Sequence, residues 1–552
     1  MDVLAIDCQA TAACPRGHLL ELGWTRLPAS ATQVQARLIR LPERERIPPA
    51  VARITGITND MMRTGVDAQD AWRELCAEAS TLPQQPAPAI AHFARFEQPF
   101  LDALAGSPKR IDLVCTHEIA RRLLPDLPRC SLRALSGYFG RGVGTLRRSA
   151  DHVEATAFVW RELVAMLHEE GIDTWADLHD WLASPFGPVR RLRRAWPMPR
   201  AERLAAPRAP GIYRMLRRSG DVLYVGKALS LHHRVNSYFR KQHGIHERTL
   251  EMLSQARAMS FEVTPTALEA ALLEADEIKR HRPPYNIAFA LEHRRVWFAS
   301  HDLGERSAAL SDRCRLGPFP SAETLDQFAA LAAGSPAALG RGRWAPDVPV
   351  FAAGYARFRA AHPELDREDL DSRARLLRLG TRLWREGRRD RDVDLDDVVS
   401  GELPVTAWTP EVVRVALEWL VLRASLARRR ARWLTRLVDA AIVWREPDLK
   451  RGLPPLPERR QPPFCARLLV LENGDIAGRD WVAPDAPPPV PAGHARLPAE
   501  RQAAFTIARL DRLRVLTTEL KRLAAAGAPV AVRFGTARPL AGRRLARVLA
   551  WV

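Results

Sequence analysis

The segment from residue 211 to residue 286 constrains the fold and the chemistry of this chain more than any other. Within it, chemically distinct side chains follow one another in a set order, separated by strand-like and helix-like stretches. Seven separated positions carry this order, which runs Tyr213, Tyr224, Lys227, Arg234, Tyr238, Glu274 and Asn286. A purely structural hairpin with chance tyrosines would require all of these roles to coincide. The segment therefore predicts a catalytic site.

The first part of this segment predicts a β-hairpin. Residues 211–216 and 222–225 are strand-like runs joined by a Ser-Gly-Asp turn. Pairing of the two strands would present Tyr213 and Tyr224 side by side. We expect Gly226 to let the backbone turn sharply into the next helix, because glycine tolerates conformations that other residues avoid.

Two helices are expected to complete the site. Residues 232–240 form a basic, helix-forming run in which Arg234 and Tyr238 lie one turn apart on one face. The last helix buries an apolar stripe and carries Glu274 on the flank of that stripe, where its carboxylate can face a cleft. Two consecutive prolines then end this helix and lead into Tyr-Asn at residues 285–286.

This order of residues resembles the GIY-YIG nuclease domain, and most closely the domain of the excision-repair nuclease UvrC and its short relative Cho. Hydrolysis of a phosphodiester requires charge stabilisation and an activated water. The resemblance implies that Glu274 is the only protein ligand of one Mg²⁺ or Mn²⁺ ion, completed by waters and phosphate oxygens. Asp276 stands where the family usually carries Asn. That position is not a ligand, and the change is expected to weaken contact with DNA.

The resemblance also implies roles for the other positions. Tyr224 is expected to act as general base or to orient the water, with Tyr213 beside it. Because a phenol titrates near about pH 10, Lys227 and the metal would have to lower the pKa of Tyr224. Arg234 would stabilise the developing negative charge on the phosphorus centre with a bidentate contact. The remaining roles, to position phosphate or hold the site together, fall to Tyr238 and Asn286.

The first 170 residues predict a second α/β domain. Buried strands are expected at residues 3–6, with Asp7 at the strand's end, and at residues 89–92, and a helix is expected at residues 113–124. The order of elements and the motif Ala-Ile-Asp-Cys-Gln-Ala-Thr around Asp7 resemble the DnaQ-like (DEDDh) 3′–5′ exonuclease domain. That resemblance implies a ribonuclease-H-like fold.

The metal-binding positions depart from that exonuclease family. Its members hold two Mg²⁺ ions between four carboxylates and use a histidine as general base. The corresponding positions in this chain are Asp7, Gln9, Glu97, Arg147 and His152. A neutral amide is a poor ligand for Mg²⁺, and the Arg–His pair brings positive charge towards a dication site. We therefore expect the exonuclease activity to be impaired, while the domain can still grip DNA or a partner protein.

The rest of the chain is less specific. Residues 171–202 predict a helix and a basic, Pro-rich linker, whose arginines are either solvated or in contact with DNA: Arg190, Arg191, Arg193 and Arg194. Residues 301–552 predict a mainly helical region, with a helix starting at Thr409-Pro410 and a hairpin on Asn473-Gly474. A further helix is expected over residues 499–525. The basic run at residues 428–432 is either a solvated face or a DNA contact.

Composition sets outer limits on these interpretations. A formal net charge of +19 favours a polyanionic partner, although an arginine-rich composition explains part of this excess. Seven scattered cysteines without a Cys-x-x-Cys pair argue against a disulfide framework and a zinc ribbon. The first residues are too short an apolar run for a signal peptide, and no run approaches a membrane span. We expect a bacterial cytoplasmic protein, associated with the nucleoid when it acts.

Together these features predict a multidomain α/β protein. The expected parts are an exonuclease-type fold at 1–170, a helix and linker at 171–202, a GIY-YIG domain at 203–300 and a Cho/UvrC-like region at 301–552. No second acidic nuclease domain, helix-hairpin-helix motif or cysteine cluster follows residue 286, which excludes a full UvrC architecture.

The favoured hypothesis is a structure-specific DNA endonuclease of nucleotide-excision repair that makes one incision. The resemblance implies UvrA and UvrB as partners, and a polymerase or sliding clamp as a possible partner of the first domain. One alternative is a 3′–5′ exonuclease of the DNA polymerase III epsilon type. The other is a DNA-binding scaffold without catalysis.

Overall fold

The structure is a computed structural model that describes most of the chain in two compact units. The described residues are 1–28, 34–106, 110–142, 144–185, 196–240, 244–286, 294–340, 346–366, 372–386, 408–446 and 465–552. One unit comprises Met1–Val263 and Pro283–Asn286, and the other comprises Thr264–Arg282 and Ile287–Val552. The predicted linker arginines, from Arg190 to Arg194, lie outside the described residues.

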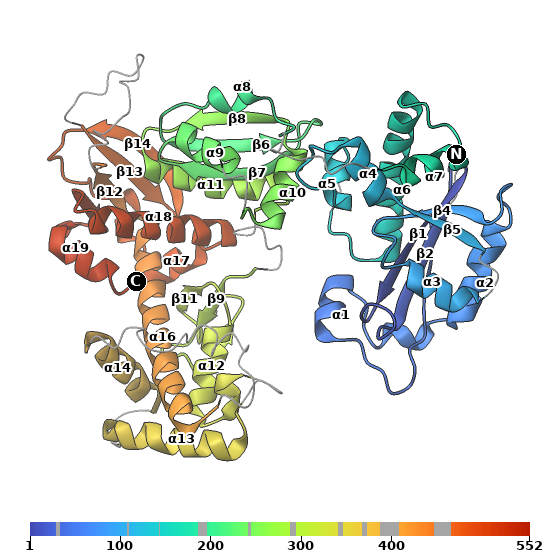
Figure 1. The fold of residues 1–552 in the computed structure, drawn as a ribbon. Helices are drawn as coiled ribbons and strands as arrows, with labels where there is room; N and C mark the ends of the chain where they lie inside the picture. Colours follow the sequence, from blue (N-terminus) through green and yellow to red (C-terminus); the bar gives the residue numbers. More distant parts are fainter. Residues whose placement is uncertain are drawn as a thin grey trace. The chain divides into compact units, whose positions relative to one another are not determined.

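The first unit begins with a five-stranded sheet in the order β3-β2-β1-β4-β5 (Figure 1). The strands are β1 (Val3–Ala10), β2 (Leu19–Leu27), β3 (Gln35–Leu38), β4 (Ala87–Ala91) and β5 (Ile111–Cys115). β1 pairs antiparallel with β2, and β2 with β3, whereas β4 runs parallel to both β1 and β5. This mixed sheet confirms the predicted α/β class of the first domain.

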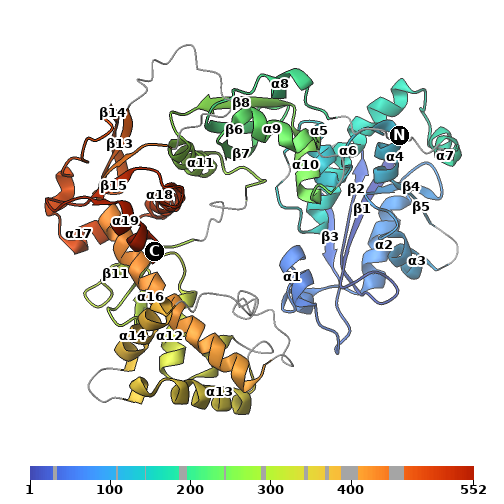
Figure 2. The same ribbon diagram turned by 60° about the vertical axis from the view of Figure 1, so that its left-hand side comes forward.

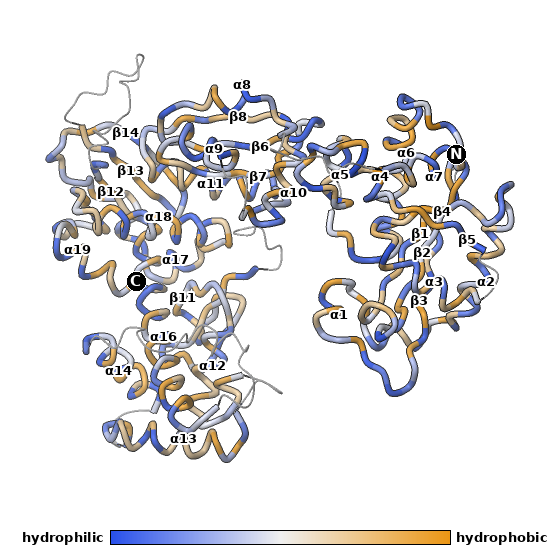
Figure 3. Tube along the Cα trace, viewed as in Figure 1, coloured by the Kyte–Doolittle hydropathy of each residue, from blue (hydrophilic) through white to orange (hydrophobic). Residues whose placement is uncertain are grey.

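Helices cover both faces of this sheet, because alternate residues of β1 point to opposite sides. Leu4 and Ile6 share a core with α2 and α3, and Val3 and Ala5 share another with α4 to α7. The inner strands are largely hydrophobic, as expected for strands buried on both faces (Figure 3). The helices of this part are α1 (Pro49–Thr55), η1 (Met61–Thr64), α2 (Ala68–Ala79), α3 (Gln98–Ala105), α4 (Thr116–Leu123), α5 (Leu132–Tyr138), α6 (Ser149–Glu169) and α7 (Trp175–Ala183).

Two details of the sequence prediction are corrected here. β1 continues to Ala10, so Asp7 lies inside the strand rather than at its end. The helix predicted over residues 113–124 begins only at Thr116, because Leu113 and Val114 pair with Ala89 and Ile90 of β4 as part of β5. Both strands extend because neighbouring strands supply hydrogen-bond partners, which a local pattern does not reveal.

A second, three-stranded antiparallel sheet in the same unit has the order β7-β6-β8. The elements of this part are α8 (Arg200–Leu204), β6 (Gly211–Leu216), β7 (Val222–Ala228), α9 (Leu231–Arg240), α10 (Glu247–Gln255) and β8 (Ala258–Val263). β6 and β7 form the predicted hairpin, in which Tyr213 lies opposite Gly226 and Met215 lies opposite Tyr224. α10 packs against α5 of the first domain, where Ser131 donates a hydrogen bond to Glu251.

The second unit contains a helical layer built around the long helix α16 (Pro410–Leu437), seen from two sides in Figures 1 and 2. Thr409 caps α16 by accepting a hydrogen bond from the main-chain nitrogen of Val412, at 3.2 Å, so the predicted helix start is confirmed. α12, α13 and α14 pack against it. The surrounding elements are β9 (Trp297–Ala299), β10 (Arg306–Ser307), β11 (Leu316–Phe319), α12 (Glu323–Ala332), η2 (Pro336–Leu339), α13 (Val348–Ala361), η4 (Pro363–Asp366) and α14 (Ser372–Arg385).

The second unit also contains a five-stranded antiparallel sheet, in the order β14-β13-β12-β15-β16. The predicted hairpin on Asn473-Gly474 is present as β13 and β14, and it belongs to this larger sheet, which the sequence did not predict. The helix expected over 499–525 is interrupted, because Thr506 caps a new helix, α18. The elements are α11 (Ala267–His281), β12 (Ala441–Trp444), β13 (Ala466–Glu472), β14 (Asp475–Val482), η6 (Ala492–Ala495), α17 (Pro498–Ala503), α18 (Ile507–Ala525), β15 (Val530–Arg533), β16 (Leu540–Ala541) and α19 (Gly542–Leu549).

Two further properties follow from the described ranges. No helix within them combines the length and the apolarity needed to cross a membrane. All seven cysteines are described, and all are free thiols.

Candidate active site

Tyr213, Tyr238 and Arg234 form a connected cluster in the first unit. Tyr213 lies on β6 with its side chain fully buried, and a hydrogen bond of 2.9 Å joins its hydroxyl to that of Tyr238 on α9. Arg234, one turn earlier on α9, donates from Nη2 to the Tyr238 hydroxyl at 3.3 Å. Burial raises the pKa of Tyr213 well above its usual value, and the neighbouring phenols raise it further. Tyr213 is therefore a neutral hydrogen-bonding group at physiological pH.

Gly226 makes room for the buried phenol of Tyr213. It lies within β7, and a Cβ atom there would be 2.5 Å from the Tyr213 hydroxyl. The sequence interpretation, a sharp turn before the next helix, is therefore replaced by a steric one. Any side chain at this position would displace the ring that positions Tyr238.

Asn286 holds the end of the segment onto the hairpin. Its side-chain amide donates to the main-chain oxygen of Val225 and accepts from the main-chain nitrogen of Val225, both at 2.9 Å. The side chain is only 8% exposed, so its amide is used for these two bonds. Of the two roles left open by the sequence, this geometry supports holding the site together.

Tyr285, which the sequence did not assign, adds a second anchor. Its hydroxyl donates to Glu251 Oε1 at 2.7 Å and accepts a hydrogen bond from Gln255. Burial and then the charge of Glu251 raise the pKa of Tyr285. The sequence signal for this anchoring role was the position of Tyr285 directly before Asn286. Polar groups that become buried after a helix-ending proline require hydrogen-bond partners.

Tyr224 and Lys227 are the two predicted site residues of the second hairpin strand. Both lie on β7 and both are partly exposed. The ring of Tyr224 lies 6.0 Å from that of Tyr213, centroid to centroid. The hairpin therefore brings the two predicted tyrosines together, with the buried one beneath and the partly exposed one available to substrate.

Glu274 lies on α11, which belongs to the second unit, and is partly exposed. The N-terminus of α11 is capped by Thr266, which accepts from the main-chain nitrogen of Glu269. A partly exposed carboxylate suits Mg²⁺, which takes oxygen ligands and retains most of its waters. The donor chemistry of Glu274 therefore fits the predicted metal.

The same helix carries two further carboxylates with long-range partners, of which the sequence did not single out Glu269. Glu269 is 1% exposed and accepts from Arg467 Nη2 of β13 at 2.7 Å. Asp276 forms an ion pair of 3.1 Å with Arg512 of α18. The Asn-to-Asp departure at position 276 thus has a structural partner in this chain. The two residues of this ion pair lie far apart in the sequence, so no local sequence pattern could have predicted the partner of Asp276.

The exonuclease-type positions are held by contacts within the protein. Gln9 Nε2 donates to one carboxylate oxygen of Asp7 at 2.8 Å, and His152 Nδ1 lies 3.4 Å from the other. Burial lowers the pKa of His152, but the hydrogen bond and charge of Asp7 outweigh it and raise the pKa overall. His152 therefore lies beside the Asp7 carboxylate, at a position where a positive charge is favourable.

The neighbouring carboxylates complete this picture. Burial, and then the charge of Asp7, raise the pKa of Glu97 to about 9. Glu97 Oε2 has no hydrogen-bond partner among the described residues, which disfavours the ionised form of this buried carboxyl. Glu21 is buried and pairs with Arg148 Nε at 3.0 Å, and it also accepts from the main-chain nitrogen of Ser149.

Arg147 lies exposed at the surface, and its side chain makes no hydrogen bond or ion pair with Asp7. Its main-chain nitrogen donates to Asp151, which caps α6 by also accepting from the nitrogen of Arg148. In the described part of the chain, no three His, Cys, Asp or Glu side chains are placed to hold a metal ion together. The residues around Asp7 therefore do not fit a two-metal centre.

Residues 209–287 match the family model of the UvrC-like GIY-YIG domain. A Mycobacterium tuberculosis protein named as a bifunctional exonuclease/endonuclease is 31% identical over 337 residues, covering 58% of this chain and 49% of that protein. UvrABC system protein C of a Psychrobacter species is 39% identical over 133 residues, covering 23% of this chain and 22% of that protein. These matches confirm the predicted resemblance to a UvrC-type GIY-YIG domain joined to an exonuclease-type domain.

Two solved structures are also similar to parts of the chain. One is the GIY-YIG N-terminal endonuclease domain of Thermotoga maritima UvrC bound to magnesium, at 35% identity, 16% of this chain, 94% of that chain and a TM-score of 0.15. The other is exonuclease X with 5′-overhanging duplex DNA, at 19% identity, 33% of this chain, 99% of that chain and a TM-score of 0.25. The chain spans about half the length of the first curated relative and under a quarter of the second.

Proposed function

We propose that this protein is a divalent-metal-dependent DNA endonuclease whose active site is the GIY-YIG segment. The observation that carries the proposal is the hydrogen-bonded Tyr213–Tyr238–Arg234 cluster within a segment that matches the UvrC-like family model. The same match includes Glu274, which supplies the carboxylate. Phosphodiester hydrolysis needs a cation, a positioned water and stabilisation of developing negative charge, and these residue types supply all three.

Each residue then has a chemical task. Glu274 would hold one Mg²⁺ or Mn²⁺ ion, which supplies Lewis-acid stabilisation of a phosphate oxygen when it is bound. Tyr224, the partly exposed phenol, orients or deprotonates the attacking water, and deprotonation by Tyr224 would require Lys227 and the metal to lower its pKa. Arg234 binds the non-bridging oxygens, while neutral Tyr213 fixes Tyr238 by hydrogen bonding. Asn286 keeps β7 in register through Val225.

The proposed biological role is a single incision in nucleotide-excision repair, leaving 3′-hydroxyl and 5′-phosphate ends. The supporting observation is the similarity to UvrABC system protein C, which suggests UvrA- and UvrB-type damage-recognition partners. The exonuclease-type domain would serve as a DNA grip or as a contact for a polymerase or clamp. These partners remain proposals for this chain.

A second function, 3′–5′ exonuclease activity, has one observation in its favour. The Mycobacterium tuberculosis relative that spans both domains is named for both activities. Against it, Gln9 and His152 occupy both carboxylate oxygens of Asp7. A DNA-binding scaffold without catalysis is the third alternative.

Two matched substitutions test these alternatives. Glu274→Gln and Asp7→Asn each remove one carboxylate with little change in shape, so both variants are assayed on nicked, gapped and bubble DNA with Mg²⁺. We expect Glu274→Gln to slow incision by roughly a hundredfold or more, since it removes the metal ligand, and Asp7→Asn to change it less than about threefold. The assays are run with and without UvrA and UvrB, because a partner-dependent enzyme is silent alone.

The outcomes separate the three functions. Loss of cleavage with Asp7→Asn would show that the first domain is the catalyst and would overturn the proposal. Absence of cleavage by the unsubstituted protein, with UvrA and UvrB present, would favour the scaffold.

A further inference from the structure

A basic cavity in the second unit shares no residue with the proposed nuclease site. Its volume is about 610 Å³, and its walls come from α14, the C-terminal half of α16, and α19 with the residues that follow it. Six arginines line it: Arg428, Arg429, Arg432, Arg436, Arg544 and Arg547. In the described part of the chain, no aspartate or glutamate side chain joins them in the lining. A concave site of this size is typical of ligand-binding sites.

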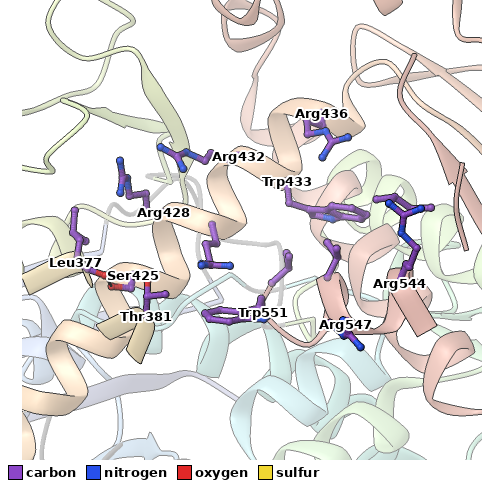
Figure 4. A pocket seen from close by; sticks show the side chains of 14 residues that line it. Leu377, Thr381, Ser425, Arg428, Arg432, Trp433, Arg436, Arg544, Arg547 and Trp551 are labelled. Carbon is purple, nitrogen blue, oxygen red and sulfur yellow. Dashed lines mark hydrogen bonds between the residues drawn. The ribbon is translucent and has the colours of Figure 1, made fainter. Parts of the chain in front are cut away.

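The six arginines come from two helices, α16 and α19, and Figure 4 labels all of them except Arg429. On α16, Arg428, Arg432 and Arg436 are separated by four residues each and so share one side of the helix. Like charges at this spacing destabilise a helix when nothing neutralises them. Arg544 and Arg547 extend from α19, one turn apart. The cavity therefore concentrates charge at a cost to stability.

The positive charge in the cavity is not neutralised by any described aspartate or glutamate, and the main-chain oxygen of Val552 in the lining accepts from Arg430, which is not one of the six. None of the six arginines forms a salt bridge with an aspartate or glutamate among the described residues. Arg428 and Arg432 both reach His301, at 3.0 Å. Burial lowers the pKa of Arg428, and the charges of neighbouring arginines lower it further. Asp302, whose charge reaches Arg428, already accepts a hydrogen bond from Arg373 at 3.0 Å.

Aromatic rings hold two of these guanidinium groups in place. Arg429 lies 3.6 Å from the ring centroid of Trp551, and Trp551 stacks on Trp384 with centroids 3.3 Å apart. Arg436 lies 4.1 Å from the ring centroid of Phe534. Stacking restrains the planar group while its N–H edges stay available for an anion. These arginines are therefore better prepared for an anion than a solvated charged face would be.

We propose that this basic cavity binds consecutive phosphates of a DNA strand, as a second contact with the substrate of the nuclease. Only the identity of the strand rests on the proposed function. One phosphate accepts hydrogen bonds from one or two guanidinium groups, so six arginines are matched to several phosphates in a row. A DNA strand supplies them, and its binding releases counterions. The basic run at residues 428–432, left open between solvated face and DNA contact, is thereby assigned to DNA.

The test compares two double variants of the full chain that remove the same charge. Arg544→Gln with Arg547→Gln changes two exposed arginines in the cavity lining, and Arg538→Gln with Arg543→Gln changes two exposed arginines that do not line it. Binding of a fluorescently labelled single strand and of a nicked duplex is measured by anisotropy over a range of KCl concentrations. EDTA is present throughout, so cleavage does not interfere.

We expect the cavity pair to lower the slope of log K against log[KCl] by roughly 1.4–1.8, which corresponds to two lost phosphate contacts. Affinity near physiological salt should fall at least about tenfold, and the control pair should change neither quantity by more than its own error. Because Arg544 and Arg547 are exposed, the variants should fold normally, and equal melting curves would verify this. The variant Arg432→Gln provides an independent check from α16, with the same direction of change.

Three results would overturn the assignment. The first is an equal loss of binding in the cavity pair and the control pair. The second is equal displacement of DNA by a polyglutamate peptide of the same charge, which would indicate an acidic protein partner. The third is competition by a free nucleoside triphosphate that is as strong as competition by the unlabelled strand at the same phosphate concentration.

Glu274→Gln separates this inference from the proposed function. In that variant, binding should keep its dependence on the cavity arginines while cleavage is lost. Cavity-dependent binding by a protein that never cleaves would remove the proposed nuclease activity and leave the DNA site. If the unsubstituted protein cleaves DNA but the two arginine pairs lower DNA binding equally, the nuclease activity stands and the DNA site in the cavity is removed.

Discussion

At the scale of single residues, the first domain shows how contacts within the protein occupy the carboxylate of Asp7. Asp7 is buried on β1 and receives Gln9 on one oxygen and His152 on the other. Glu97 lies nearby, and its burial together with the like charge of Asp7 raises its pKa to about 9. A carboxyl in this situation folds in its protonated form.

This protonated carboxyl predicts a pH dependence of stability. The pKa of Glu97 is raised from an ordinary value of 4.5 to about 9, so the folded state holds the proton more tightly than the unfolded state. The resulting stabilisation is fully present below the unfolded pKa and is lost as the pH rises through the folded pKa. Glu97→Gln should therefore stabilise the first domain at pH 8 relative to the unsubstituted protein. The difference should grow by up to about 1.4 kcal/mol per pH unit above pH 5.

Thermal melts between pH 5 and pH 8 measure this difference. Asp7→Asn is the matched control, since removing the like charge lowers the pKa of Glu97 and flattens the pH dependence. A stability difference between Glu97→Gln and the unsubstituted protein that does not change with pH would contradict the prediction.

At the scale of elements, α11 is held by the second unit along much of its length. Leu268 and Leu272 lie in one hydrophobic core with residues of α18 and the five-stranded sheet. Polar contacts reinforce this packing, because Lys279 lies 3.5 Å from the buried carboxylate of Asp511, and Asp276 binds Arg512. The helix that carries Glu274 is therefore positioned by residues more than 180 positions away in the sequence, as the Glu269–Arg467 pair shows.

Breaking the pair between Glu269 and Arg467 should destabilise the second unit. Both side chains are at least 90% buried, so Arg467→Gln leaves the Glu269 carboxylate without its cation and should cost about 3–5 kcal/mol. Replacing both residues by glutamine should cost less than the single change, because no buried charge remains. Arg306→Gln is the control, since it removes the exposed partner of Asp326 and should cost under about 1 kcal/mol. Denaturant unfolding followed by tryptophan fluorescence distinguishes these values, and equal costs for Arg467→Gln and Arg306→Gln would disprove them.

Local chemistry explains which elements were predictable from the sequence. Thr409-Pro410 and Asn473-Gly474 set a helix start and a hairpin turn through their own backbone preferences, and both are present. The tyrosine pair was predictable because one short turn joins its two strands. By contrast, the need for glycine at position 226 comes from the Tyr213 ring on the neighbouring strand, and the partner of Asp276 lies on α18. Neither contact is visible in the local sequence. The five-stranded sheet escaped prediction because β12 pairs with β13 and β15 across long sequence separations.

At the scale of the whole molecule, the division into units differs from the predicted sequence domains. The predicted GIY-YIG domain spans residues 203–300, and its limits remain a prediction. The compact units assign Thr264–Arg282 to the second unit and Pro283–Asn286 to the first. The segment that carries the seven site positions therefore contributes to two hydrophobic cores, through Tyr213 in one and Leu268 in the other. The helix that carries Glu274 therefore depends for its packing on the core of the second unit.

This shared segment predicts that α11 loses protection when the C-terminal region is removed. A fragment of residues 1–300 retains α11 but lacks the core residues that cover Leu268 and Leu272, which are fully buried in the full chain. Burial of a leucine contributes about 1.5–3 kcal/mol, so amides of α11 should exchange with solvent roughly a hundredfold faster or more in the fragment. Hydrogen exchange followed by mass spectrometry measures this directly in both proteins. Amides of β1 are the internal control, because their packing lies wholly within the retained residues and should protect them equally. Unchanged protection of α11 in the fragment would contradict the prediction, because it would show that α11 folds without the C-terminal region.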